Sequence, residues 1–61
     1  MSATEGSVYE AIKNGKGESI SSLIEETKLS RASIERAIQS LKELGKIKRV
    51  GNKRSGYYEV N

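Results

Sequence analysis

Apolar residues recur along most of this chain at the three- and four-residue spacing of amphipathic helices. The pattern predicts three helices, over residues 7–14, 20–27 and 31–44. Their inward-facing positions are Val8, Tyr9, Ile12, Ile20, Leu23, Ile24, Thr27, Ile34, Ala37, Ile38, Leu41 and Leu44. Because the remaining positions are mostly polar, each helix has one side to bury and one side to expose to water.

Serines and a glycine mark where the predicted helices begin and end. Ser19 and Ser30 precede the second and third helices and are good N-caps, because a serine hydroxyl accepts from a free amide of the first turn. Ser22 stands where a complete capping box would have Glu or Gln, so the cap at Ser19 is incomplete. Gly45 ends the third helix. Residues 1–6 are small or polar and are expected to form a disordered tail.

The pattern changes to alternation after the third helix. It predicts two strands, over residues 47–50 and 57–60, joined by the basic loop 51–56. A two-stranded hairpin alone is marginal in water, so it should lie against the first and third helices. The side chains expected to cover the helical core are Ile47, Val50, Tyr58 and Val60. The sequence therefore predicts one α+β domain over residues 7–60, with three short helices followed by a two-stranded antiparallel hairpin.

Composition removes most of the chemistry that an active site needs. The 61 residues contain no Cys, His or Asp, so the commonest metal ligands and the commonest general base are missing. Residues 15–19 hint at a phosphate loop but lack the Gly-x4-Gly-Lys-Ser/Thr spacing. We expect no catalysis, no metal site, no cofactor and no small-molecule ligand.

Hydropathy and leader patterns bear on where the chain acts. No apolar run approaches the roughly 20 residues that span a bilayer, and no signal peptide is evident. We therefore expect no membrane contact and a cytoplasmic location, on the nucleoid if the source is bacterial or archaeal.

Charge is divided unevenly along the chain, whose net charge is +3. Residues 1–27 hold two Lys and five Glu, net −3, whereas residues 28–56 hold nine Lys or Arg and two Glu, net +7. Such a split within one small domain suggests an oriented contact with a polyanion. A solvated basic surface would have the same composition, so charge alone leaves nucleic-acid binding open.

The run from Ser19 to Val60 resembles a winged helix-turn-helix domain of bacterial and archaeal transcriptional regulators. The resemblance covers about residues 8–60. It rests most on Leu29-Ser30-Arg31, on Ile34 and Ile38, and on Leu41-Lys42-Glu43-Leu44-Gly45-Lys46-Ile47, and then on Arg49-Val50-Gly51 and Gly56-Tyr57-Tyr58-Glu59-Val60. The last run is similar to the Gly-Tyr-Trp-x-Val ending of small winged domains, with Tyr58 in place of the tryptophan.

Two residues depart from the pattern of that family. Lys28 stands where the turn between the second and third helices usually has a left-handed glycine, a conformation that costs another residue on the order of 1 kcal/mol. Glu18 stands where a short strand before the second helix often has an apolar residue. We therefore expect this strand to be weak or absent.

The resemblance implies double-stranded DNA binding, as a transcriptional regulator or its DNA-reading domain. Helix 31–44 would enter the major groove, and loop 51–56 would touch the backbone or the minor groove. The residues then expected to contact DNA are Ser30, Arg31, Ala32, Glu35, Arg36, Gln39, Lys48, Arg49, Lys53 and Arg54.

Several of these residues have alternative roles. Arg36 suits guanine or a phosphate, and Gln39 suits adenine. Glu35 suits cytosine, or it is a surface charge paired with Arg31 or Gln39 on the same helix. Ser30 is a cap that could also receive a phosphate, and consecutive strand residues such as Lys48 and Arg49 alternate in direction, so only one should face DNA.

Other functions stay open at this point. Winged domains also serve as protein-docking modules of larger nucleic-acid-processing proteins, and fold alone does not settle function. Z-form nucleic-acid binding is disfavoured, because the Z-alpha domain uses an Asn, a Tyr and a proline-rich wing where this chain has Glu35, Gln39 and no proline. A homodimer and a tether to a parent protein both remain open, because a monomer contacts few base pairs.

Overall fold

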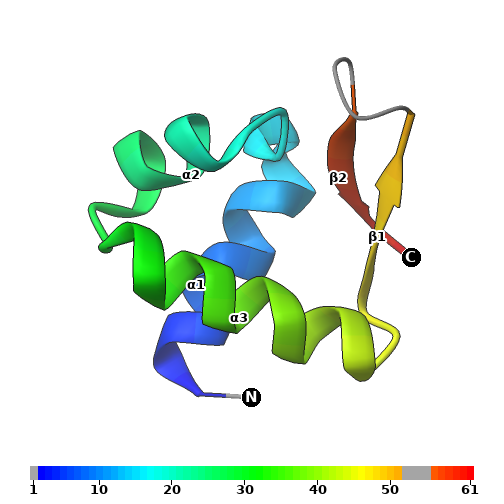
Figure 1. The fold of residues 1–61 in the computed structure, drawn as a ribbon, viewed down its shortest axis with the longest axis horizontal. Helices are drawn as coiled ribbons and strands as arrows, with labels where there is room; N and C mark the ends of the chain where they lie inside the picture. Colours follow the sequence, from blue (N-terminus) through cyan, green and yellow to red (C-terminus); the bar gives the residue numbers. More distant parts are fainter. Residues whose placement is uncertain (1, 52–55) are drawn as a thin grey trace.

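The computed structural model describes residues 2–51 and 56–61. The described residues form helices α1 (Ala3–Ala11), η1 (Ile12–Lys16), α2 (Ile20–Thr27) and α3 (Arg31–Glu43), then strands β1 (Ile47–Val50) and β2 (Tyr57–Val60). The strands pair antiparallel, and α3 crosses over α1 with the hairpin standing to one side of the helices (Figure 1). The predicted α+β class, the helix over 20–27 and both strands are confirmed. The wing residues Lys53 and Arg54 lie outside the described residues.

The first helix begins earlier than the sequence pattern predicts. Ser2 caps α1, because its hydroxyl accepts from the Glu5 amide at 3.2 Å while the Glu5 carboxylate accepts from the Ser2 amide at 2.8 Å. This reciprocal capping box satisfies two free amides of the first turn. The expected disordered tail over 1–6 is therefore wrong for residues 2–6, where the Ser-x-x-Glu signature outweighs the small and polar composition.

The turn between α2 and α3 has the backbone conformation that normally selects glycine. Lys28 lies in the left-handed region, with φ 63° and ψ 20°, and its amide donates to the Ile24 carbonyl at 2.8 Å. The Thr27 hydroxyl donates to the Leu23 carbonyl at 2.6 Å and accepts from the Leu29 amide at 3.3 Å. The turn thus has the left-handed backbone geometry that a glycine would normally adopt. Because Lys28 has a Cβ, this conformation is strained.

The core is aliphatic and is built mainly from the helices. Its buried members are Val8, Ala11, Ile12, Leu23, Ile34, Ala37, Ile38, Leu41 and Ile47. Around them lie the partly buried Tyr9, Ile20, Ile24, Leu29, Tyr58 and Val60.

Two expected core positions are wrong. Leu44 is 59% exposed, because α3 ends at Glu43 and the chain turns away at Gly45, with φ 73°. Val50 pairs with Tyr57 on the hairpin face opposite Ile47, so it does not join the core cluster.

Strand β2 is attached to the helices at Gly17. The Tyr58 amide donates to the Gly17 carbonyl at 2.7 Å, and a Cβ built at Gly17 would lie 2.5 Å from the Tyr58 carbonyl oxygen. Only glycine permits this approach. Within the described residues no strand forms around Glu18, as the sequence predicts, and this single backbone bond stands in its place.

Replacing Lys28 by glycine should stabilise the domain. Lys28→Gly removes the strain of a left-handed residue that has a Cβ, which is worth about 1 kcal/mol and raises Tm by about 4–8 °C in a domain of this size. Thermal unfolding followed by circular dichroism measures the shift. The matched control is Lys42→Gly in the last turn of α3, which should lower Tm, because glycine has a lower helix propensity than lysine and the lysine charge is favourable at the C-terminal end of a helix. An unchanged or lower Tm for Lys28→Gly would contradict the assignment of strain.

The capping box should make stability depend on pH in the acid range. The hydrogen bond from the Ser2 amide, followed by one from the Ser40 hydroxyl, lowers the pKa of Glu5 below its usual range. Since the folded pKa is the lower one, this stabilisation is complete above the unfolded pKa and disappears as pH falls through the folded pKa. Glu5→Gln should therefore flatten part of the loss of Tm that occurs as pH falls below the usual pKa of a glutamate, whereas the control Glu10→Gln should retain the loss at Glu5. Equal acid sensitivity in both variants would refute the contribution of the capping box.

Candidate nucleic-acid interface

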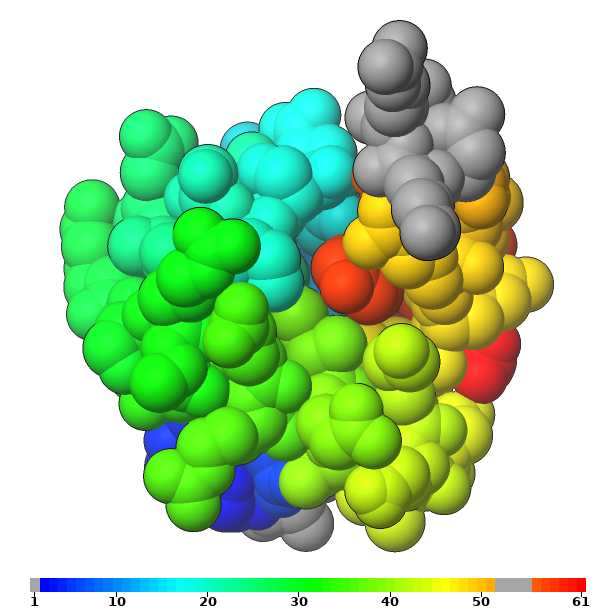
Figure 2. Space-filling view, viewed as in Figure 1, coloured from blue at the N-terminus to red at the C-terminus, as the bar shows by residue number. Residues whose placement is uncertain are grey.

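The outer side of α3 presents a polar surface opposite the core. Ile34, Ile38 and Leu41 are buried beneath the helix. Its exposed residues include every α3 position expected from the sequence to contact DNA, which are Arg31, Ala32, Glu35, Arg36 and Gln39. In Figure 2 this surface (green) lies on the same face of the molecule as part of the hairpin (yellow to red).

The beginning of α3 is capped as predicted. The Ser30 hydroxyl oxygen accepts from the Ser33 amide at 3.2 Å, and the two hydroxyls are 3.0 Å apart. Ser30 is exposed, and the unpaired amides of the first turn give this end of the helix a partial positive charge. The capping role of Ser30 is therefore confirmed, while contact with a phosphate stays a prediction.

Arg31 and Glu35 form an ion pair one turn apart. The Arg31 Nε lies 3.2 Å from the Glu35 Oε2, and the two side chains are 68% and 54% exposed. Of the alternatives open for Glu35, the structure contains the surface pair with Arg31. Exposed pairs at this spacing contribute only about 0.3–0.5 kcal/mol. Arg31 can therefore exchange Glu35 for another anion at small cost.

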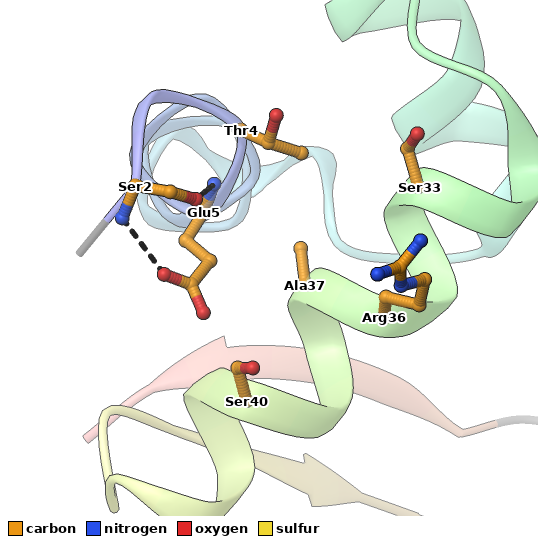
Figure 3. Close-up of a pocket in the computed structure, with 7 residues that line it drawn as sticks. All are labelled: Ser2, Thr4, Glu5, Ser33, Arg36, Ala37 and Ser40. Carbon is orange, nitrogen blue, oxygen red and sulfur yellow. Dashed lines mark hydrogen bonds between the residues drawn. The ribbon is translucent and has the colours of Figure 1, made fainter.

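Arg36 lies on the side of α3 that faces the first turn of α1. It lines a groove of about 380 Å³ together with Ser2, Thr4, Glu5, Ser33, Ala37 and Ser40. Figure 3 shows Arg36 and Ser40 on α3, with Glu5 projecting from α1 and bonded to Ser2. Within residues 2–51 and 56–61 Arg36 has no ion pair or hydrogen bond from its side chain. Its guanidinium is therefore available to a ligand that approaches α3.

The two cations of β1 point to opposite faces of the hairpin, as predicted. Lys48 is opposite Glu59 in the register, and its Nζ lies 3.4 Å from the Glu59 Oε1 on the face turned away from the core. Arg49 shares the other face with the buried Ile47. Arg49, and not Lys48, is therefore the strand cation on the helical side.

Arg49 is held against the tyrosine opposite it. The Arg49 Nη1 donates to the Tyr58 hydroxyl at 3.3 Å, and the guanidinium carbon lies 5.3 Å from the centre of the Tyr58 ring. The sequence pattern assigns Tyr58 to the core alone, and Tyr58 does pack against the core. The contact with Arg49 could be found only from the strand register, which pairs residues 49 and 58.

Tyr57 is 42% exposed and lies opposite Val50 on the outer face of the hairpin. Lys53 and Arg54, expected at the tip of the wing, lie outside the described residues.

None of the helices in the described part of the chain is long and apolar enough to cross a membrane. No group of three or more carboxylate, His or Cys side chains in the same residues is placed to hold a metal ion.

Comparison with known families gives a match over most of the chain. The family model described as a helix-turn-helix (HTH) domain matches residues 7–58 of the chain, from within α1 to within β2. Among curated proteins no match is found.

Proposed function

We propose how this chain, which belongs to the helix-turn-helix domain family and is a DNA-binding module, engages double-stranded DNA. In this proposal α3 enters the major groove of double-stranded DNA, and the hairpin contacts the backbone beside it. The supporting observation is the exposed polar side of α3, which has a capped first turn and a basic hairpin next to it. The domain would act in the cytoplasm as a transcriptional regulator or as the DNA-reading part of one.

The dimensions and surface of α3 suit a groove. Its 13 residues span about 20 Å, and the major groove is about 12 Å wide and admits one helix. Ala32 is small and exposed near the first turn, so the backbone can approach the bases closely there. The positive end of the helix and the exposed Ser30 lie where a phosphate at the edge of the groove would be received.

The helix and the hairpin would contribute differently to binding. Residues 31–43 hold three cations and two Glu, net +1, whereas residues 46–54 hold five cations and no Glu. Non-specific affinity for DNA grows with the number of phosphates that are neutralised. We therefore assign most of the affinity to the hairpin segment, including Lys53 and Arg54, and most of the base discrimination to α3.

We assign individual roles to four exposed residues of α3. Arg36 would read guanine through its paired donors, and Gln39 would read adenine. Arg31 would leave Glu35 for a phosphate, because the exposed pair between them is weak. Glu35 would then be free to accept from cytosine.

Docking of a basic protein is the second candidate function. It is favoured by the acidity of residues 1–27, net −3, and by the exposure of Glu10, Glu25 and Glu26 on α1 and α2. These residues belong to different elements from the cationic ones, so titration followed by NMR separates the two candidates.

DNA binding should weaken steeply with salt. If about 4–5 phosphates are neutralised, the logarithm of the binding constant should fall against the logarithm of salt concentration with a slope of about −4. Fluorescence anisotropy with a short mixed-sequence duplex measures this slope. Amide shifts at low salt should concentrate in α3 and β1. A flat salt response, or no amide shift change in residues 31–54, would favour the docking function instead.

Replacing Arg36 by alanine should relax base specificity. Arg36→Ala should cost about 1–3 kcal/mol on the selected site and lose the preference at one base pair. Selection of bound duplexes from a random pool, repeated with the variant, measures both effects. Lys42→Ala is the matched control, because it removes one positive charge from the same helix and should weaken all sequences equally. Uniform weakening by Arg36→Ala as well would make Arg36 a phosphate contact.

A further inference from the structure

Tyr58 packs against the core and also contacts Arg49, the residue opposite it. The inference drawn from this contact rests on the proposed function. We propose that Tyr58 is a positioning residue that orients the Arg49 guanidinium for a DNA phosphate beside the groove occupied by α3. The contact joins the two strands across the hairpin, with 3.3 Å between Arg49 Nη1 and the Tyr58 hydroxyl.

The strand register brings the two side chains together. Arg49 and Tyr58 face each other directly, while the Tyr58 amide points away from β1 and donates to the Gly17 carbonyl at 2.7 Å. Residues 49 and 58 are therefore a non-hydrogen-bonded pair, the kind in which facing side chains come closest in an antiparallel ladder. Stacking of the guanidinium at 5.3 Å from the ring centre follows from this closeness.

Tyr58 can orient Arg49 because both its side chain and its backbone are held in place. Its side chain packs against the core cluster, and its backbone is bonded to Gly17 at the end of η1. A side chain held in place before binding loses less conformational freedom when a ligand arrives. The orientation of Arg49 is thereby tied to the helices and not only to the hairpin.

The two cations of β1 also differ in the charge of the side chain that each contacts on β2. Lys48 is held by the Glu59 carboxylate, which opposes its charge. The contacts that Tyr58 makes with Arg49 come from a phenol hydroxyl and a ring face, neither of which has a formal charge. Tyr58 therefore restricts the geometry of the guanidinium without opposing its charge. Of the two strand cations, Arg49 is the one on the helical side of the hairpin, beside the groove that α3 would occupy.

The test removes one oxygen atom. Tyr58→Phe keeps the ring and its packing but deletes the hydroxyl that accepts from Arg49. We expect affinity for a short mixed-sequence DNA duplex to fall about 2- to 5-fold, the size of one modest hydrogen bond. The salt slope should stay unchanged, because no charge is lost. Tyr57→Phe is the matched control, since it deletes the same atom from the adjacent residue on the outer face and should change neither quantity.

A double-mutant cycle shows whether Tyr58 acts through Arg49. In the Arg49→Ala background, Tyr58→Phe should have no further effect on affinity. In the free protein, ¹⁵N relaxation of the Arg49 Nε–Hε group should show a more mobile guanidinium in Tyr58→Phe than in wild type. Unfolding temperatures of both variants report on any general loss of packing.

Each outcome bears on a separate claim. Wild-type affinity in Tyr58→Phe, an equal loss in the Arg49→Ala background, or unchanged Arg49 relaxation would overturn the positioning role while leaving the α3 interface intact. Absence of salt-dependent DNA binding by the wild-type protein would instead remove the proposed function, and the positioning role with it.

Discussion

The hairpin keeps its place because strand β2 approaches the helical region at one glycine. A Cβ at Gly17 would lie 2.5 Å from the Tyr58 carbonyl oxygen, and the Tyr58 amide donates to the Gly17 carbonyl. Two strands alone are marginal in water, so the hairpin depends on this bond and on the burial of Ile47. The close approach also determines which hairpin face turns toward the helices.

That orientation separates two cations that are neighbours in sequence. Lys48 is directed outward, toward Glu59, whereas Arg49 is directed to the helical side, against Tyr58. Side chains alternate strictly along a strand, so a one-residue shift in pairing would exchange their positions. The register is held at its open end by a further bond, from the Asn61 amide to the Lys46 carbonyl at 3.0 Å. Placement of charge on this domain is therefore a consequence of backbone pairing.

Local sequence patterns predict helix ends and strands correctly wherever one short segment determines the structure. The caps at Ser19 and Ser30, the stop at Gly45 and the two strands follow from residues adjacent in sequence, and all are present. Predictions were wrong where two local tendencies compete. At Ser2 a capping box prevailed over a composition typical of tails, and at Leu44 the helical period continued past the end of the helix.

The candidate interface was less predictable than the fold because it depends on which side chains meet. Spacing allows Glu35 two partners on the same helix, and only the folded structure selects Arg31. Arg36 is exposed, but its position beside the first turn of α1 follows only from the packing of α1 on α3. The role of Tyr58 could be inferred only after the strand register was known.

The small size of the domain explains why a residue that packs against the core can also take part in the proposed contact with DNA. The core contains no Phe or Trp, so partly buried tyrosines at its edge supply apolar area that a larger protein would bury fully. A phenol at such an edge has one side packed and a hydroxyl near the surface, where it can bond a neighbour. Tyr58 meets both conditions, and its hydroxyl bonds Arg49. Because one side chain serves both tasks, truncating it would confuse a loss of folding with a loss of recognition, and only changes that preserve the ring can distinguish them.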